Sequence, residues 1–243
     1  MYWRNLNGRK TKGIYTDFYR KWKRENKGIN LEQPDIIILP GSKNTIEDLL
    51  FLREKGIDQE IKKAHQKGSS VFGICGGYQM LGETIEDPYQ VESKKGWIKG
   101  LNLLPLKTIL TNEKATNRTK GTLTINGQKV DVAGYEIHMG QTIASSSLQS
   151  LIILANGADG YKNKSETCIG TYLHGIFHND EFRKIFLDLI RKKKGLPTSL
   201  NRESYVDKQL SDFHRLANTV RDAIDIDRLH KIIEQYPKGK ERQ

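Results

Sequence analysis

Two short apolar runs separated by one helical stretch constrain the fold more than any other feature of the sequence. Residues 35–39 (DIIIL) end at a Pro-Gly pair, and residues 70–74 (SVFGI) lead directly to a cysteine. Continuous apolar runs of this length are typical of strands that are buried on both faces of a parallel sheet. Between them, residues 45–67 carry apolar side chains at helical spacing, interrupted at Gly56. The sequence therefore predicts a βαβ unit with a right-handed connection.

The chain continues with further strand and helix signals. A strand is predicted at residues 168–173 and ends at His174, and an amphipathic helix is predicted around residues 182–190. Apolar residues at helical spacing predict two more helices, near residues 206–220 and 229–233. We therefore expect an α/β fold with a mostly parallel central sheet flanked by helices, followed by a helical C-terminal extension.

The patterning also divides the chain. Residues 1–33 are rich in Lys, Arg, Asn and Gly, and we interpret them as a weakly specified lead-in. The main domain is predicted at residues 34–190 and the helical extension at residues 191–243. Within the domain, Asn126-Gly127 between two alternating segments is the strongest hairpin signal, so we expect an antiparallel excursion near residues 119–140.

Composition narrows the class of protein. No stretch approaches the ~20 apolar residues of a membrane-spanning helix, and the first residues lead into no apolar signal segment. We expect a cytoplasmic protein without membrane contact, with its two cysteines as free thiols and no metal site. The net charge of +11 is spread along the chain without a helix-turn-helix, zinc-finger or stacking motif. An anionic small molecule or an acidic partner therefore fits the charge better than a nucleic acid.

Cys75 lies in the sharpest local motif, GICGGYQMLG at residues 73–82. Glycines on both sides permit a tight strand-to-helix turn, which strains the backbone and brings it close to a substrate. We predict that the thiol projects at the carboxyl end of the sheet, where the following helix N-terminus favours the thiolate. A buried structural role is the ordinary interpretation of an arbitrary cysteine. That interpretation fits Cys168, which lies within a predicted strand and lacks such neighbours.

A thiol nucleophile needs a base, and the chain contains six histidines. His65, His214 and His230 lie in helical, basic contexts that are typical of the surface. His174 instead follows a predicted strand, so it lies at the sheet edge where open α/β folds bind ligands. The sequence thus predicts that Cys75 and His174 act together.

Four ordered motifs together resemble the class I glutamine amidotransferases. CGGYQ at residues 75–79 is similar to the nucleophile elbow of that family. LPGSKNT at 39–45, GYEIHMG at 134–140 and GTYLHGIF at 170–177 resemble its cobyric acid synthase branch. The C-terminal helices are similar as well, so the resemblance covers roughly residues 34–235. It implies a flavodoxin-like α/β fold.

The resemblance also implies a reaction. Cys75 would attack the side-chain amide of glutamine, form a thioester and release ammonia, with His174 as general base and acid. The ammonia would amidate corrinoid carboxylates for cobalamin biosynthesis on a synthetase domain or subunit. ATP and magnesium are expected only in that synthetase, and no cofactor is implied for the glutaminase domain.

The resemblance assigns further residues to the substrate. The backbone amides of Gly41 and Gly76 would form the oxyanion hole, and Gln79 would contact the glutamine. A simple turn at Gly41 and a solvated helix position for Gln79 are the alternatives. Glu136 and His138, polar residues in a strand-like run, are candidates to line the pocket, and core or hairpin positions explain them equally well.

Two features depart from the family pattern. Many triad amidotransferases have a glutamate two residues after the histidine, where this chain has Ile176, so we predict a dyad. No GxxxxGK[ST] loop occurs in the sequence, so we expect no synthetase half here. We interpret the chain as a fragment, a separately encoded subunit or the product of a disrupted gene.

Two other functions stay open. One is the glutaminase subunit of an enzyme that amidates a cell-wall lipid intermediate, whose elbow is also CGGYQ. Met139 and the SKNT stretch favour the corrinoid branch over it. The other is a non-catalytic binding or regulatory remnant of the fold.

Overall fold

The computed structural model describes residues 3–4, 10–11, 31, 33–144, 148–198 and 204–235. The chain divides into two compact units, Met1–Ser199 and Leu200–Gln243. Most of the predicted lead-in, residues 1–33, lies outside the described residues.

The secondary structure follows the predicted alternation of strands and helices. The first unit contains β1 (Trp3–Arg4), β2 (Lys10–Thr11), β3 (Ile36–Leu39), α2 (Thr45–Glu54), α3 (Ile57–Gln66), β4 (Ser70–Ile74), α4 (Gly76–Met80), β5 (Thr84–Glu86), β6 (Trp97–Lys99), β7 (Leu106–Ile125), β8 (Gln128–Ala144), β9 (Ser150–Leu154), β10 (Gly157–Lys162), β11 (Cys168–Thr171), β12 (Leu173–His174), η1 (Ile176–His178) and α5 (Asp180–Lys193). The second unit contains α6 (Tyr205–Ala223) and α7 (Ile226–Gln235).

One sheet organises the first unit. Its strands follow the order β12-β8-β7-β9-β10-β11-β4-β3, with β5 and β6 attached beside β7. The predicted βαβ unit is confirmed, since β3 pairs in parallel with β4, and β4 pairs in parallel with β11. Among the described strands, the other parallel pair is β5 with β7, and the remaining ladders are antiparallel. The α/β class is as predicted, but the parallel part of the sheet is narrower than expected.

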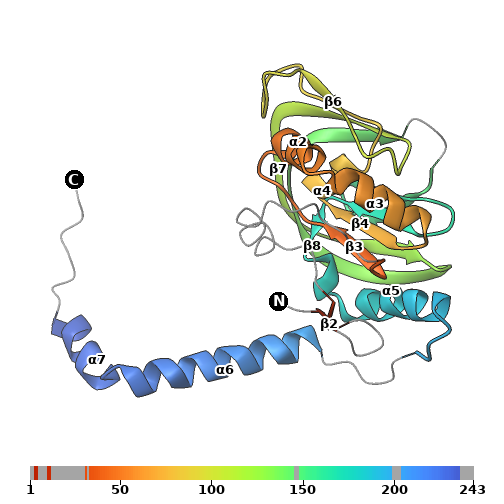
Figure 1. Cartoon of the computed structure of the whole chain (residues 1–243). Helices are drawn as coiled ribbons and strands as arrows, with labels where there is room; N and C mark the ends of the chain where they lie inside the picture. Colours follow the sequence, from red (N-terminus) through yellow and green to blue (C-terminus); the bar gives the residue numbers. More distant parts are fainter. Residues whose placement is uncertain are drawn as a thin grey trace. The chain divides into compact units, whose positions relative to one another are not determined.

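The antiparallel segment is longer than the predicted excursion near residues 119–140. β7 and β8 pair from the turn at Asn126-Gly127 out to Leu106 and Ala144. Both turn residues have positive φ, 50° and 71°, as a two-residue hairpin turn of this type requires. A register shift between Ile109 and Lys114 marks a bulge, and bulges bend strands. Figure 1 shows these two long strands curving as part of the main sheet.

Helices cover both faces of the parallel strands. The predicted helical stretch 45–67 is two helices, α2 and α3, because Gly56 adopts a left-handed conformation (φ 68°) between them. Val71 of β4 packs into the core cluster that α2 and α3 complete, whereas its neighbour Phe72 packs into a second cluster with α5. This alternation is the period of a strand buried on both faces. The helices α2 and α3 lie over β3 and β4 in Figure 1.

The second unit consists of the two predicted C-terminal helices. Ser204 caps α6 by accepting a hydrogen bond from the backbone N–H of Asp207 at 3.4 Å. None of the described side chains of these two helices is buried, and most of the apolar ones are exposed. No helix among the described residues is long and apolar enough to cross a membrane.

Candidate active site

Cys75 occupies a strained turn between β4 and α4. Its backbone has φ 52° and ψ −115°, a positive φ that is unusual for a residue with a side chain. The flanking glycines make this turn possible. A Cβ on Gly77 would lie 2.1 Å from the carbonyl oxygen of Leu39, and one on Gly73 would lie 2.7 Å from the carbonyl oxygen of Gly77. The predicted elbow is therefore present, and it packs directly against β3.

The Cys75 thiol is covered, contrary to the prediction that it projects from the sheet. The residue is only 7% exposed, and its Sγ donates a hydrogen bond to the carbonyl oxygen of Ile137 on β8 at 3.4 Å. Burial raises the pKa of the thiol, the N–H of Gly76 acts in the opposite direction, and the charges of Glu92 and Asp159 raise it further. The predicted preference for the thiolate is thus outweighed by desolvation, because β8 shields the turn from water.

His174 lies on β12, beside the same strand β8. In the register of β12 and β8 it stands opposite Tyr135, and the two rings stack with centroids 5.1 Å apart and planes within 4°. Burial lowers the pKa of the imidazole, a hydrogen bond with the Ile137 backbone raises it, and the charge of His138 lowers it. Its Nε2 is buried and has no hydrogen-bond partner among the described residues. That nitrogen is available to accept or donate a proton.

Gly41 brings the two residues together. A Cβ built on Gly41 would lie 3.2 Å from Cε1 of His174 and 3.6 Å from Cβ of Cys75. The turn after β3, the elbow after β4 and the end of β12 therefore meet at one point, as the sequence predicted for Cys75 and His174. The absence of a side chain at Gly41 leaves space beside both.

Gln79 is held in the interior behind the elbow. Its Oε1 accepts a hydrogen bond from Oγ1 of Thr45 at 3.0 Å, and its Nε2 donates to the carbonyl of Met139 at 3.1 Å and to Oη of Tyr172 at 3.2 Å. The side chain is 2% exposed, so the alternative of a solvated helix position is wrong. Its proposed contact with glutamine stays a prediction.

Glu136 and His138 lie together on β8. His138 Nε2 is 3.8 Å from Oε1 of Glu136, and its ring stacks on Tyr172 with centroids 3.7 Å apart. Asn156 donates a hydrogen bond to Oε2 of Glu136 at 3.0 Å. His138 is close enough to His174 for its charge to lower the pKa of that imidazole. The contact of Glu136 and His138 with substrate also stays a prediction.

The comparisons with known proteins decide the family. The sequence model of the family described as the CobB/CobQ-like glutamine amidotransferase domain matches residues 16–182. The chain belongs to this family of amidotransferase domains. The resemblance found in the four motifs is thereby confirmed.

Curated relatives extend this match. The chain is 43% identical over 211 residues to the cobyric acid synthase of Anoxybacillus flavithermus, covering 86% of this chain and 42% of that protein. It is 39% identical over 230 residues to the cobyric acid synthase of Caldanaerobacter subterraneus, covering 89% of this chain and 45% of that protein. The chain thus spans less than half the length of these relatives.

A solved structure supports the fold. The structure of PurLQS from Thermotoga maritima superposes with a TM-score of 0.51 at 17% identity, covering 68% of this chain and 82% of that one. At this identity the likeness concerns the fold alone.

Several residues near the candidate site were not singled out from the sequence. Asp159, 6% exposed, accepts hydrogen bonds from Oγ1 of Thr171 and from the N–H of Tyr172 at 3.1 Å, and burial raises its pKa. Glu92 accepts from the N–H of Thr45 at 2.6 Å. Neither carboxylate lies in a recognisable motif. Tyr135, in contrast, lies within the GYEIHMG motif, which was the available signal for it.

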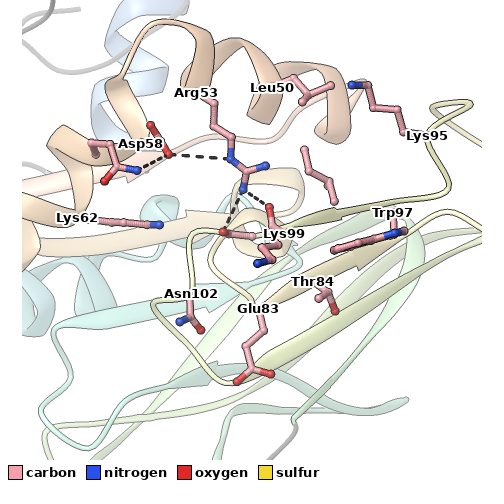
Figure 2. Close-up of a pocket in the computed structure, with 13 residues that line it drawn as sticks. Leu50, Arg53, Asp58, Lys62, Glu83, Thr84, Lys95, Trp97, Lys99 and Asn102 are labelled. Atoms are coloured by element: carbon pink, nitrogen blue, oxygen red, sulfur yellow. Dashed lines mark hydrogen bonds and ion pairs between the residues drawn. The ribbon is translucent and has the colours of Figure 1, made fainter.

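A separate open pocket of about 820 Å³ lies away from the predicted site residues. Figure 2 shows Arg53 reaching across it towards the carbonyls of Lys99 and Gly100, with Asp58 4.0 Å from the guanidinium. Trp97 and several lysines complete its wall. None of Cys75, His174 and the five predicted substrate-binding residues lines this pocket, so it is distinct from the candidate site.

Proposed function

We propose that this amidotransferase domain hydrolyses glutamine through a thioester at Cys75 and supplies ammonia for the ATP-dependent amidation of corrinoid carboxylates. The observation that carries the proposal is the convergence of Cys75 and His174 beside Gly41. A thiol and an imidazole in this arrangement form a nucleophile with its base. Four ordered motifs and the family match support glutamine as the substrate.

The first half of the reaction forms the thioester. His174 takes the thiol proton, and Sγ of Cys75 attacks the carbonyl carbon of the glutamine side chain. The amide oxygen then carries negative charge, which the backbone N–H groups of Gly41 and Gly76 stabilise. One such donor contributes about 3–4 kcal/mol in comparable enzymes. The C–N bond breaks as the imidazolium donates its proton to the nitrogen, and ammonia leaves.

The second half restores the thiol. His174, now neutral, takes a proton from water, and the resulting hydroxide attacks the thioester carbonyl. The S–C bond breaks, glutamate leaves, and Cys75 recovers a proton from the imidazolium. No metal or nucleotide enters these steps, so we propose that ATP and magnesium act only on the synthetase that receives the ammonia.

The thiol must turn before it can react. In the structure its proton is directed to the carbonyl of Ile137, and its pKa is raised by burial. Attack therefore requires the thiol to turn from β8 towards Nε2 of His174. We propose that glutamine, and contacts from the synthetase, favour this arrangement, so the domain alone turns over slowly.

The names of the curated relatives support the corrinoid branch over cell-wall lipid amidation. The presence of both Cys75 and His174 argues against a non-catalytic remnant of the fold. These alternatives are separable by assay. The purified chain should release glutamate and ammonia slowly from glutamine.

Addition of a separately expressed cobyric acid synthetase part, ATP, magnesium and a corrinoid acid should accelerate glutamine turnover and yield amidated product. The matched control is Cys75→Ser in the same mixture. Product from the chain, ATP and the corrinoid acid without the synthetase would contradict the proposal. Absence of glutamine hydrolysis in every mixture would favour the remnant.

A further inference from the structure

The orientation of His174 needs an explanation, because the position two residues later offers no carboxylate. Ile176 occupies it, and its side chain is fully buried in the apolar cluster beneath α5. An acid–base imidazole nevertheless has to keep one nitrogen aimed at its partner throughout the reaction. Another group must therefore hold the ring.

Tyr135 is placed to do this by the sheet itself. It stands directly opposite His174 in the register of β8 and β12, so both side chains leave the sheet on the same face. The rings are almost parallel, with an angle of 4° and a centroid separation of 5.1 Å. Parallel, offset stacking along one cross-strand pair restrains the plane of the imidazole. It leaves Nε2 without a competing hydrogen bond among the described residues.

We propose that Tyr135 is a positioning residue that holds His174 by stacking and stabilises the imidazolium formed during proton transfer, in place of a carboxylate. The inference rests on the proposed acid–base role of His174. A cation within about 6 Å of an aromatic ring centroid is attracted to the face of that ring. The attraction is greater for the imidazolium than for the neutral ring, so it acts when the proton has been taken up.

The other groups around His174 do not provide this stabilisation. His138 on β8 carries like charge when protonated, and the negative charge that Cys75 gains by giving up its proton is lost from the sulfur when it bonds to the glutamine carbon. Arg118 on β7 stands opposite Tyr135 in the register, which places another positive charge on the same face. Among the described residues, the Ile137 backbone is the remaining favourable contact of His174, and it is shared with the Cys75 thiol. Within the part of the chain that the structure describes, the tyrosine ring is thus the favourable contact of His174 that is not shared with the Cys75 thiol.

Two substitutions separate stacking from simple space filling. Tyr135→Leu keeps apolar cover but removes the aromatic face, whereas Tyr135→Phe keeps the face and removes the hydroxyl. We expect Tyr135→Leu to lower kcat for glutamine hydrolysis by about 3–30-fold with little change in KM, and Tyr135→Phe to retain most of the activity. Tyr89→Leu, at an exposed tyrosine outside the site, is the matched control and should behave as the unsubstituted chain.

The sign of the pH effect follows from the stack. Stacking favours the imidazolium and raises the pKa of His174, so its loss lowers that pKa. The acidic limb of the kcat profile should therefore move to lower pH in Tyr135→Leu and stay in place in Tyr135→Phe. A direct readout is the titration of the His174 ring protons by NMR, with the signal assigned from its absence in His174→Gln.

The NMR titration keeps this inference separate from the proposed function. If glutamine is not hydrolysed at all, the function fails, but a titration midpoint that moves to lower pH in Tyr135→Leu still supports the stack. An unmoved midpoint in Tyr135→Leu overturns the inference, whether or not activity falls. Equal losses of activity in the Phe and Leu variants would also overturn it, because the hydroxyl would then be the important group.

Discussion

Cys75 and Cys168 lie at opposite ends of two neighbouring strands and show what distinguishes a nucleophile from a core thiol. In the parallel pairing of β4 and β11, Cys168 stands beside Val71 near the amino ends. At the carboxyl ends, the N–H of Cys75 donates to the carbonyl of Thr171 at 2.9 Å. Both cysteines are buried, and burial raises the pKa of both thiols.

The two cysteines differ in the polar groups that surround them. Burial alone accounts for the raised pKa of Cys168, which lies in an apolar cluster. Cys75 has the N–H of Gly76 and the carbonyl of Ile137 as partners, and His174 lies across Gly41. The two cysteines do not differ in exposure, because both are buried. They differ because Cys75, at the carboxyl edge of the sheet, lies near groups that can accept or donate a proton.

The largest expected effect is loss of the nucleophile. Cys75→Ser should lower glutamine hydrolysis by at least about 10³-fold, because a serine hydroxyl here has no comparable route to a covalent intermediate. Cys168→Ala should keep the activity and cost about 1 kcal/mol of unfolding free energy. Steady-state assays and thermal melts of both variants measure this. Comparable loss of activity in Cys168→Ala would break the distinction between the two ends.

Removal of the base comes next. His174→Ala should lower hydrolysis by about 10²–10⁴-fold, the usual range for a general acid–base group, while the fold is kept. His178→Ala, on η1 beyond the end of β12, is the matched control and should lose much less. Circular dichroism establishes folding of both variants. Equal losses would assign the wrong histidine.

Thiol labelling sharpens the comparison through pH. Burial raises the pKa of Cys75, so little thiolate exists at neutral pH in the free domain. Alkylation of Cys75 by iodoacetamide should therefore be slow near pH 7 and accelerate as the pH rises. Cys168 should stay unlabelled until the chain unfolds. Peptide mapping after timed labelling gives both rates. Labelling of Cys75 that is already fast at pH 7 and does not accelerate at higher pH would contradict the claim that the thiol is buried and protonated.

The hairpin between β7 and β8 should give the smallest effect, and on stability alone. Gly127 has φ 71°, where an L-residue costs about 1–2 kcal/mol. Gly127→Ala should lower the unfolding free energy by about that amount and leave kcat near its original value. Lys129→Ala, at an exposed position two residues later, controls for any loss of stability that an alanine substitution near the hairpin turn causes by itself. Denaturant titration is the measurement.

The sequence predicts the parts of the site whose signals are local. Cys75 and His174 were found because each is predicted at the end of a strand, although the structure divides the second strand into β11 and β12 and places His174 within β12. The elbow glycines are required because the elbow approaches β3 closely. Asn126-Gly127 predicted its hairpin for the same reason, since the turn conformation depends on those two residues.

Features that arise from distant segments were not predicted. The cover over Cys75 is a contact with Ile137 on β8, so the sequence around the elbow gives no sign of it. Asp159 acquires its partners only when β10 lies beside β11. The small number of parallel strands was also not predicted. Whether the strands that follow β11 in the sheet order are parallel or antiparallel depends on which strands pair, and the pairing joins segments that are distant in the sequence.

The most direct test of the central claim is detection of the glutamyl thioester on the protein. Rapid acid quenching of the chain during turnover with isotopically labelled glutamine, followed by peptide mass spectrometry, shows where the label is bound. We predict a labile glutamyl adduct on the peptide that contains Cys75, and its absence in Cys75→Ser. Continued release of labelled glutamate from Cys75→Ser, or an adduct on the peptide that contains Cys168, would contradict the account.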